Sequence, residues 1–160
     1  MKNVAHKKKW QSFEIVFGIP FFSAIILQFI YPLSFSFKQL YEIFIFGGVV
    51  LIILGLAFII LAHRELSKYS QPTDPGYPTN KLVTTGVFSI SRNPLYLGGV
   101  CVVFGIGLSL NIGWILILLL PSLIACHYIL VMPEEKYLTA MFGEEYHIYS
   151  NSVHRWVGRA

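Results

Sequence analysis

The segment LVTTGVFSISRNPLYLG, residues 82–98, decides how this chain is organised. It lies between two pairs of hydrophobic segments, and it places Arg92, Asn93, Pro94 and Tyr96 directly at the start of an apolar run. A polar group held at a membrane boundary loses part of its hydration, so an arginine there needs a partner or a ligand. We therefore interpret this segment as the floor of a cofactor pocket.

The composition predicts a membrane protein. Of the 160 residues, 55% are hydrophobic and only 12% are charged, and the mean hydropathy is +0.63. These polar residues are too few to cover a soluble domain of this size. The net charge of +4 does not indicate a nucleic-acid partner, because the basic residues lie in the short segments between apolar runs. Cys101 and Cys126 lie inside apolar segments without metal-ligand spacing, so we predict no metal site.

Four apolar segments are candidates to cross a bilayer, which requires about 20 residues of helix. They cover residues 13–31, 40–62, 95–110 and 112–132. The third segment is short and is followed only by a turn at Asn111 and Gly113, which predicts a tight helical hairpin. The expected fold is a single all-α integral membrane domain, residues 1–160, with about four transmembrane helices.

Two polar regions flank the hairpin. Residues 63–81 are rich in proline and are predicted to form a long loop, either a lid or a surface tether. After Pro133, the apolar residues Leu138, Met141 and Phe142 recur at helical spacing with charges between them. This pattern predicts an amphipathic helix along the membrane surface, interrupted at Gly143.

The distribution of lysine and arginine predicts the orientation. Eleven of the twelve lie before the first segment, between the second and third, or after the fourth, and only Lys38 lies in the other loops. By the positive-inside rule, both termini and the central loop are expected in the cytoplasm.

Two motifs flank the hairpin and resemble the isoprenylcysteine carboxyl methyltransferase family with its bacterial relatives. RNPLYLG, residues 92–98, is similar to the Arg-His-Pro-x-Tyr-x-Gly motif of that family. The residues after the fourth segment resemble a second motif of the same family. Together the two motifs extend the resemblance over residues 81–157. The matching residues are Glu134, Glu135, Leu138, Phe142, Gly143, Tyr146, Tyr149, Val153 and Arg155.

The resemblance implies a membrane methyltransferase that uses S-adenosylmethionine at the cytosolic face. Its acceptor would be a lipophilic small molecule or a lipidated substrate from the bilayer, methylated on the carboxyl group of an isoprenylcysteine-like end. Arg92 and Glu135 are the implied catalytic residues. The cofactor region would cover residues 82–98 and 133–157. The implied cofactor contacts are Leu82, Gly86, Arg92, Asn93, Tyr96, Gly98, Glu134 and Glu135.

Physical chemistry is compatible with this site. S-adenosylmethionine carries an ammonium, a carboxylate and an adenine, which require a carboxylate, a cation and apolar or aromatic walls. Glu134 or Glu135, Arg92, and Tyr96 supply these types of group. For an amine acceptor, Glu135 would accept the proton.

Asn93 departs from the family pattern, which has histidine at this place. An Asn-Pro pair here is similar instead to the phospholipid N-methyltransferases, so the methyl acceptor stays open. Two further classes also stay open: an NADPH-dependent membrane reductase, and a non-catalytic membrane scaffold in which Arg92 and Glu135 form a structural ion pair.

Overall fold

The structure is a computed structural model that describes residues 11–35, 38–73 and 77–159. Within these ranges the regular elements are helices, apart from one isolated β-bridge between Val153 and Arg159. The predicted all-α class is therefore confirmed. The lysines near the N-terminus and residues 74–76 of the proline-rich loop lie outside the described residues.

The first two helices follow the first two apolar segments. α1 spans Phe13–Ile30, and α2 spans Tyr41–Lys68 after a short 3-10 turn, η1, at Lys38–Leu40. The prediction that residues 63–68 belong to the following loop is wrong, because α2 continues through them. Hydropathy falls at His63, but Arg64, Glu65, Leu66 and Lys68 are good helix formers, so loss of apolar character does not end the helix.

The third and fourth segments form the predicted hairpin. α3 spans Pro94–Ser109 and begins with a proline at its first position, where the missing N–H costs no hydrogen bond. α4 spans Gly113–Ala125. The turn between them is tight, and Asn111 takes a positive φ of 53° there. Pro94 thus places Arg92 and Asn93 immediately before α3 begins.

The helix predicted after Pro133 is present, but it is a continuation of the fourth apolar helix and not a separate helix. α4 continues through a π-helical turn, η3, at Cys126–Val131 into α5, Met132–Phe142, as one helix of 30 residues. The wider turn just before Pro133 accommodates a residue that cannot donate a backbone hydrogen bond. Gly143 interrupts the helix as predicted, and α6 spans Glu144–Ser152.

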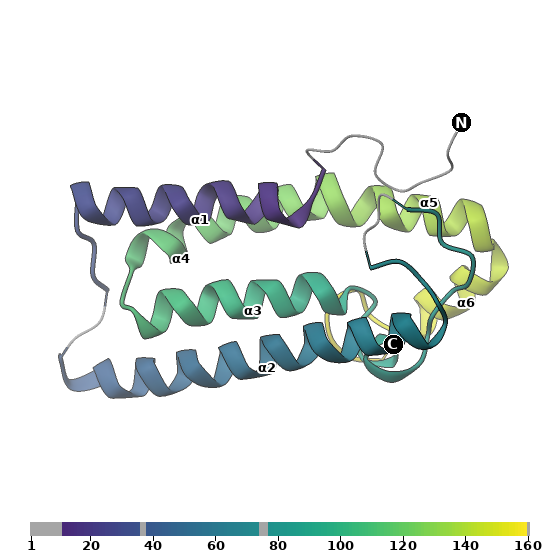
Figure 1. Ribbon diagram of the computed structural model, residues 1–160, viewed down its shortest axis with the longest axis horizontal. Helices are drawn as coiled ribbons and strands as arrows, with labels where there is room; N and C mark the ends of the chain where they lie inside the picture. The colour runs from purple at the N-terminus through teal and green to yellow at the C-terminus, as the bar shows by residue number, and fades with distance from the viewer. Residues whose placement is uncertain (1–10, 36–37, 74–76, 160) are drawn as a thin grey trace.

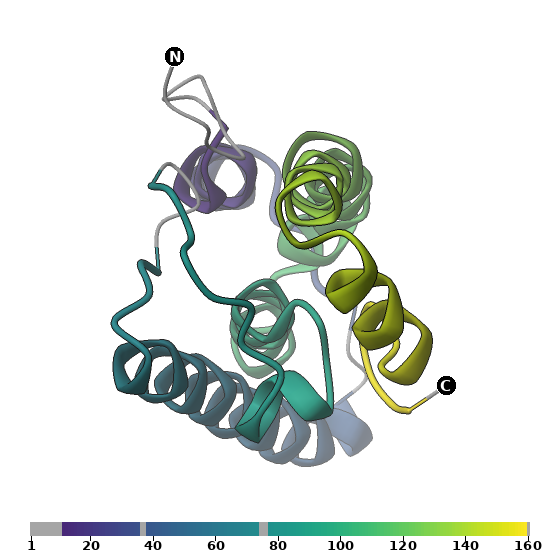
Figure 2. The ribbon, with the colours of Figure 1, turned by 90° about the vertical axis from the view of Figure 1, so that its right-hand side faces the viewer.

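The helices form an elongated bundle (Figure 1). α2 packs along α3, α1 packs along α4, and α3 contacts both α2 and α4. Seen from one end, α3 lies between α2 and the pair of α1 and α4 (Figure 2). The start of α1, the segment that precedes α3, and α6 all lie at the same end of the bundle.

Glycines allow α2 and α3 to approach closely. A Cβ added at Gly55 would lie 2.5 Å from the carbonyl oxygen of Gly98, and one at Gly98 would lie 2.6 Å from that of Gly55. Gly48 and Gly105 form a second reciprocal contact of the same kind. These glycines therefore serve helix packing, as expected in a membrane bundle.

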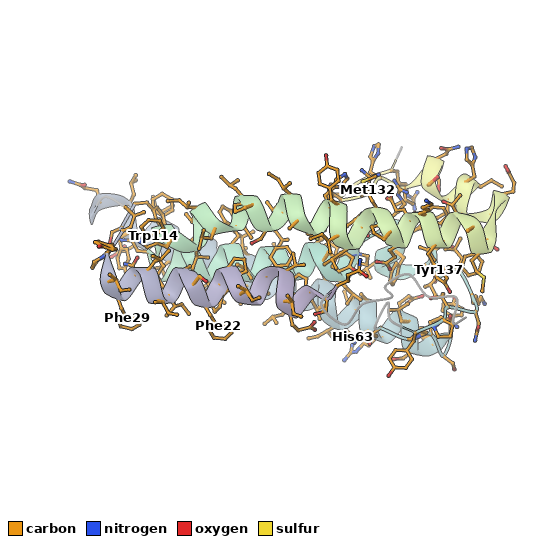
Figure 3. The ribbon with its side chains drawn as sticks, turned by 90° about the horizontal axis from the view of Figure 1, so that it is seen from above. Phe22, Phe29, His63, Trp114, Met132 and Tyr137 are labelled. Atoms are coloured by element: carbon orange, nitrogen blue, oxygen red, sulfur yellow. The ribbon has the colours of Figure 1, made fainter. Side chains whose placement is uncertain are left out.

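The outer surface suits a lipid environment. Three helices in the described part of the chain are long and apolar enough to cross a membrane: α1, α2 and the continuous helix Gly113–Phe142. α3 is apolar but has 16 residues, which gives about 24 Å at 1.5 Å per residue, shorter than the bilayer core. Phe22 and Phe29 of α1 point away from the bundle and are 66% and 84% exposed (Figure 3). The protein is therefore a membrane protein.

Candidate active site

The segment before α3 is fastened to the polar end of α2. Glu65 is buried, and its carboxylate accepts hydrogen bonds from the Thr85 hydroxyl at 2.5 Å and from Lys68 at 2.6 Å. Gly86 begins the 3-10 turn η2, Gly86–Ser89, with φ of 61°. A Cβ at Gly86 would lie 2.8 Å from a Glu65 oxygen, so only glycine fits this contact without displacement.

A C-terminal strap, residues 153–159, docks on the end of the same segment. The backbone N–H of Arg92 donates to the carbonyl of His154 at 3.2 Å, and the N–H of Gly158 donates to the carbonyl of Ile90 at 2.9 Å. The side-chain amide of buried Asn93 donates to the carbonyl of Arg155 at 3.0 Å. Asn93 therefore holds the strap with its side chain.

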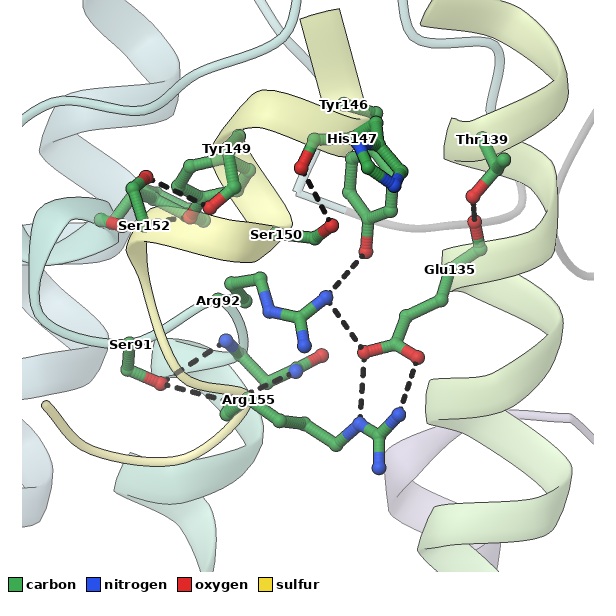
Figure 4. Close-up of polar contacts among 12 residues, drawn as sticks. Ser91, Arg92, Glu135, Thr139, Tyr146, His147, Tyr149, Ser150, Ser152 and Arg155 are labelled. Atoms are coloured by element: carbon green, nitrogen blue, oxygen red, sulfur yellow. Dashed lines mark hydrogen bonds and ion pairs between the residues drawn. The ribbon is translucent and has the colours of Figure 1, made fainter. Parts of the chain in front are cut away.

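An ion cluster joins the segment, the strap and α5 (Figure 4). Arg155 donates from Nε and Nη2 to the two carboxylate oxygens of Glu135, each at 2.8 Å. Arg92 Nη1 lies 3.2 Å from Glu135 Oε1 and donates to the Tyr146 hydroxyl at 3.2 Å. The side chains of Arg92 and Glu135 are 13% and 18% exposed. Two guanidiniums thus share one carboxylate, which leaves the cluster with a net positive charge.

The surroundings of the cluster shift the pKa of two of its groups, Tyr146 and Arg155. Burial raises the pKa of the Tyr146 hydroxyl, and the nearby Glu135 carboxylate adds to this, so Tyr146 is neutral at ordinary pH. Hydrogen bonds to Glu135 raise the pKa of the Arg155 guanidinium. Arg92 Nε is buried and has no hydrogen-bond partner. A buried donor without a partner is costly, so an acceptor on a ligand that paired with the Arg92 guanidinium would be favoured.

A second polar pair lies beside the cluster. The Tyr96 hydroxyl donates to the Glu134 carboxylate at 2.9 Å, which links the first turn of α3 to the first turn of α5. The Tyr96 ring is buried in the core and packs near Phe13 of α1, with ring centroids 6.3 Å apart.

A polar cleft of about 470 Å³ opens over the ion cluster. α5 and α6 supply most of its walls, and the π-helical turn η3 supplies His127 at the boundary of the apolar span. Its volume lies within the range of small-molecule and cofactor sites. The lining residues are Arg92, His127, Met132, Glu135, Lys136, Thr139, Tyr146, Ser150, Asn151 and Arg155.

The structure brings some of the predicted site residues into this cleft. Arg92 and Glu135 line it, and the linked Tyr96 and Glu134 lie next to them. The other four have structural surroundings. Leu82 packs in a buried cluster with Tyr146, Tyr149 and Val153, Asn93 holds the strap, Gly86 faces Glu65, and Gly98 faces α2.

Several cleft residues received no role from the sequence. Tyr146 and Arg155 stood in the C-terminal motif, but spacing along the chain does not show that either reaches Glu135. Thr139, Ser150 and Asn151 are polar residues of ordinary helices and carry no signal of their own. For His127, its position late in an apolar segment was the available signal.

The phospholipid methyltransferase family model matches residues 43–145, more than half of the chain. The chain belongs to the phospholipid methyltransferase family. The match includes the motif at Arg92 and both glutamates, whereas Tyr146 and Arg155 lie beyond it. No curated protein and no solved structure gave a significant match.

Membership of this family indicates a membrane methyltransferase. The resemblance to methyltransferases seen in the two flanking motifs is therefore confirmed at the level of the wider superfamily. The match does not select the isoprenylcysteine carboxyl methyltransferases, so that finer assignment stays a prediction.

Proposed function

We propose that this protein transfers a methyl group from S-adenosylmethionine to a lipophilic acceptor at the cytosolic face of its membrane. The observation that carries the proposal is the cluster of Arg92, Glu135 and Arg155 at the floor of a polar cleft beside an apolar span. The family match supports the type of reaction.

The residues of the cleft fit the proposed cofactor. Its carboxylate suits Arg92, which has a buried, unpartnered Nε in a cluster of net positive charge. Hydroxyl and amide groups of Thr139, Ser150 and Asn151 line the cleft and suit the polar atoms of a nucleoside. S-adenosylmethionine supplies an electrophilic methyl group bound to a sulfonium.

The protein's own contribution is alignment and exclusion of water. In-line displacement needs no covalent help, and alignment of two reactants can contribute about 7 to 11 kcal/mol. Arg92 is held by Tyr146 and Glu135, so its orientation is fixed before a ligand enters. His127 and Met132 lie in the final turns of the apolar span, which supports entry of the acceptor from the bilayer.

The family description favours a phospholipid amine as the acceptor. Such an amine must lose a proton before it is methylated, and His127 is a cleft residue able to accept one, whereas both oxygens of Glu135 already bind Arg155. The motif at residues 92–98 favours a second candidate, the carboxylate of an isoprenylcysteine, which needs no base. Asn93 does not decide between them, because its side chain holds the strap.

Transfer of a labelled methyl group tests the proposal. Protein in lipid nanodiscs would receive methyl-labelled S-adenosylmethionine with either phosphatidylethanolamine or N-acetyl-farnesylcysteine. We expect label in the phospholipid, lost in Arg92→Ala and retained in Arg159→Ala, because Arg159 is an exposed arginine of the strap outside the cleft. Label only in the prenylated compound would select the second candidate. No transfer to either acceptor, together with binding of NADPH, would contradict the proposal and favour a reductase.

A further inference from the structure

Arg155 makes two connections at once. Its guanidinium binds both oxygens of Glu135 on α5, and its backbone carbonyl accepts hydrogen bonds from Asn93 at 3.0 Å and from the Ser91 hydroxyl at 3.4 Å. Asn93 and Ser91 are buried at 7% and 0% exposure. The backbone of Arg155 is therefore anchored on the segment that carries Arg92, while its side chain reaches across to α5.

This arrangement determines how the charge of Glu135 is shared. Arg155 donates two parallel hydrogen bonds to Glu135, whereas Arg92 approaches the same carboxylate through one nitrogen at the longer distance of 3.2 Å. A paired fork of this kind is the strongest geometry between arginine and a carboxylate. Without Arg155, Glu135 would have Arg92 as its partner in the cluster, and the two charges would cancel.

We propose that Arg155 is a positioning residue that occupies Glu135 and so keeps Arg92 available to a ligand carboxylate. Asn93 sets the place of Arg155 by holding its carbonyl. Asn93, which stands where the resembled motif has histidine, then serves to dock the strap and does not recognise the acceptor. This inference rests on the proposed cofactor site.

Binding of S-adenosylhomocysteine to protein in nanodiscs, measured by calorimetry, tests the role of Arg155. We expect Arg155→Ala to weaken binding about tenfold, the size typical of coupling between contacting charged residues. Arg159→Ala is the matched control, because it removes an exposed arginine from the same strap, and its affinity should equal that of the wild type. Wild-type affinity in Arg155→Ala would overturn the positioning role.

A double-mutant cycle distinguishes positioning from direct contact with the ligand. If Arg155 acts through Glu135, Arg155→Ala in a Glu135→Gln background should change the affinity less than twofold. An equal loss in both backgrounds would show that Arg155 binds the ligand itself, and would overturn the proposal. No binding by the wild type would instead contradict the proposed cofactor site.

Arg155→Lys covers the case in which the alanine variant does not fold. Lysine keeps the charge but has no planar fork, so we expect weakened binding with the melting temperature close to that of the wild type. Full affinity in Arg155→Lys would contradict the requirement for paired hydrogen bonds to Glu135.

Discussion

Tyr96 and Glu134 join α3 to α5 through a hydrogen bond of 2.9 Å between the tyrosine hydroxyl and the carboxylate. Successive residues of a helix point about 100° apart, so fixing the direction of Glu134 also fixes the direction of Glu135. The buried tyrosine therefore helps to aim Glu135 at Arg92 and Arg155, although Tyr96 does not line the cleft itself.

Removal of the Tyr96 hydroxyl tests this link. Tyr96→Phe leaves the Glu134 carboxylate without that donor, and we expect a loss of about 1 to 3 kcal/mol of unfolding free energy. The measurement is reversible unfolding in mixed micelles, with cofactor affinity measured in parallel. Tyr128→Phe serves as the control, because Tyr128 is 64% exposed on the neighbouring η3 turn. Equal stability of both variants would show that the hydrogen bond contributes nothing.

Two adjacent glycines of α2 allow a matched test of helix packing. A Cβ at Gly48 would lie 2.6 Å from the Gly105 carbonyl oxygen, whereas one at Gly47 would meet nothing within 4 Å. Gly48→Ala should cost about 1 to 3 kcal/mol, as overpacking does. Gly47→Ala should be neutral or stabilise the helix by up to about 1 kcal/mol. Thermal unfolding in detergent measures both, and similar melting temperatures would contradict the close approach of α2 and α3.

The fastening of residues 82–93 to α2 depends on the Thr85 hydroxyl. Thr85→Val removes its hydrogen bond to Glu65 and the one that joins it to the Tyr69 hydroxyl, and we expect the end of α2 and the following loop to loosen locally. Limited proteolysis between residues 69 and 81 should then become faster. Thr84→Val is the control, since Thr84 is the neighbouring threonine and the side chains that donate to Glu65 are those of Thr85 and Lys68. Unchanged cleavage in Thr85→Val would exclude this role for the Thr85–Glu65 contact.

Gly143 sets the change of direction between α5 and α6. Its backbone has φ of 51° and ψ of −120°, and a Cβ there would meet nothing within 4 Å, so any cost of substitution is conformational. Gly143→Ala should destabilise the protein by about 1 to 3 kcal/mol and weaken cofactor binding, because α6 carries Tyr146 into the cleft. Gly18→Ala, inside α1 with open space around it, should not destabilise. Melting temperatures and affinities of the two variants check this contrast.

Much of the fold follows from hydropathy and from residues with special backbone properties. The apolar segments gave the helices, Pro94 marked the start of α3, and Gly143 marked the end of α5. The sequence did not predict that the helix continues through Pro133. A proline can begin a new helix, or it can lie inside one helix that has a π-helical turn before it. The extension of α2 to Lys68 was missed because hydropathy falls before the helix ends.

The site was only partly predictable for a different reason. Arg92 and Glu135 stand in motifs, so chemistry and resemblance pointed to both. The contacts of Arg155 and Asn93 depend on how the strap folds back on the segment before α3, and each hydrogen bond of this return uses a backbone group of the strap. Backbone bonds leave no pattern in side-chain type, so sequence alone does not reveal them.

Calorimetric titration of S-adenosylmethionine and S-adenosylhomocysteine into the purified protein tests the central claim most directly. The wild type should bind both saturably, with weaker binding in Arg92→Ala and wild-type affinity in Arg159→Ala while both variants stay folded. Absence of binding by the wild type in lipid as well as in detergent would contradict the account, and NADPH would be the next ligand to titrate.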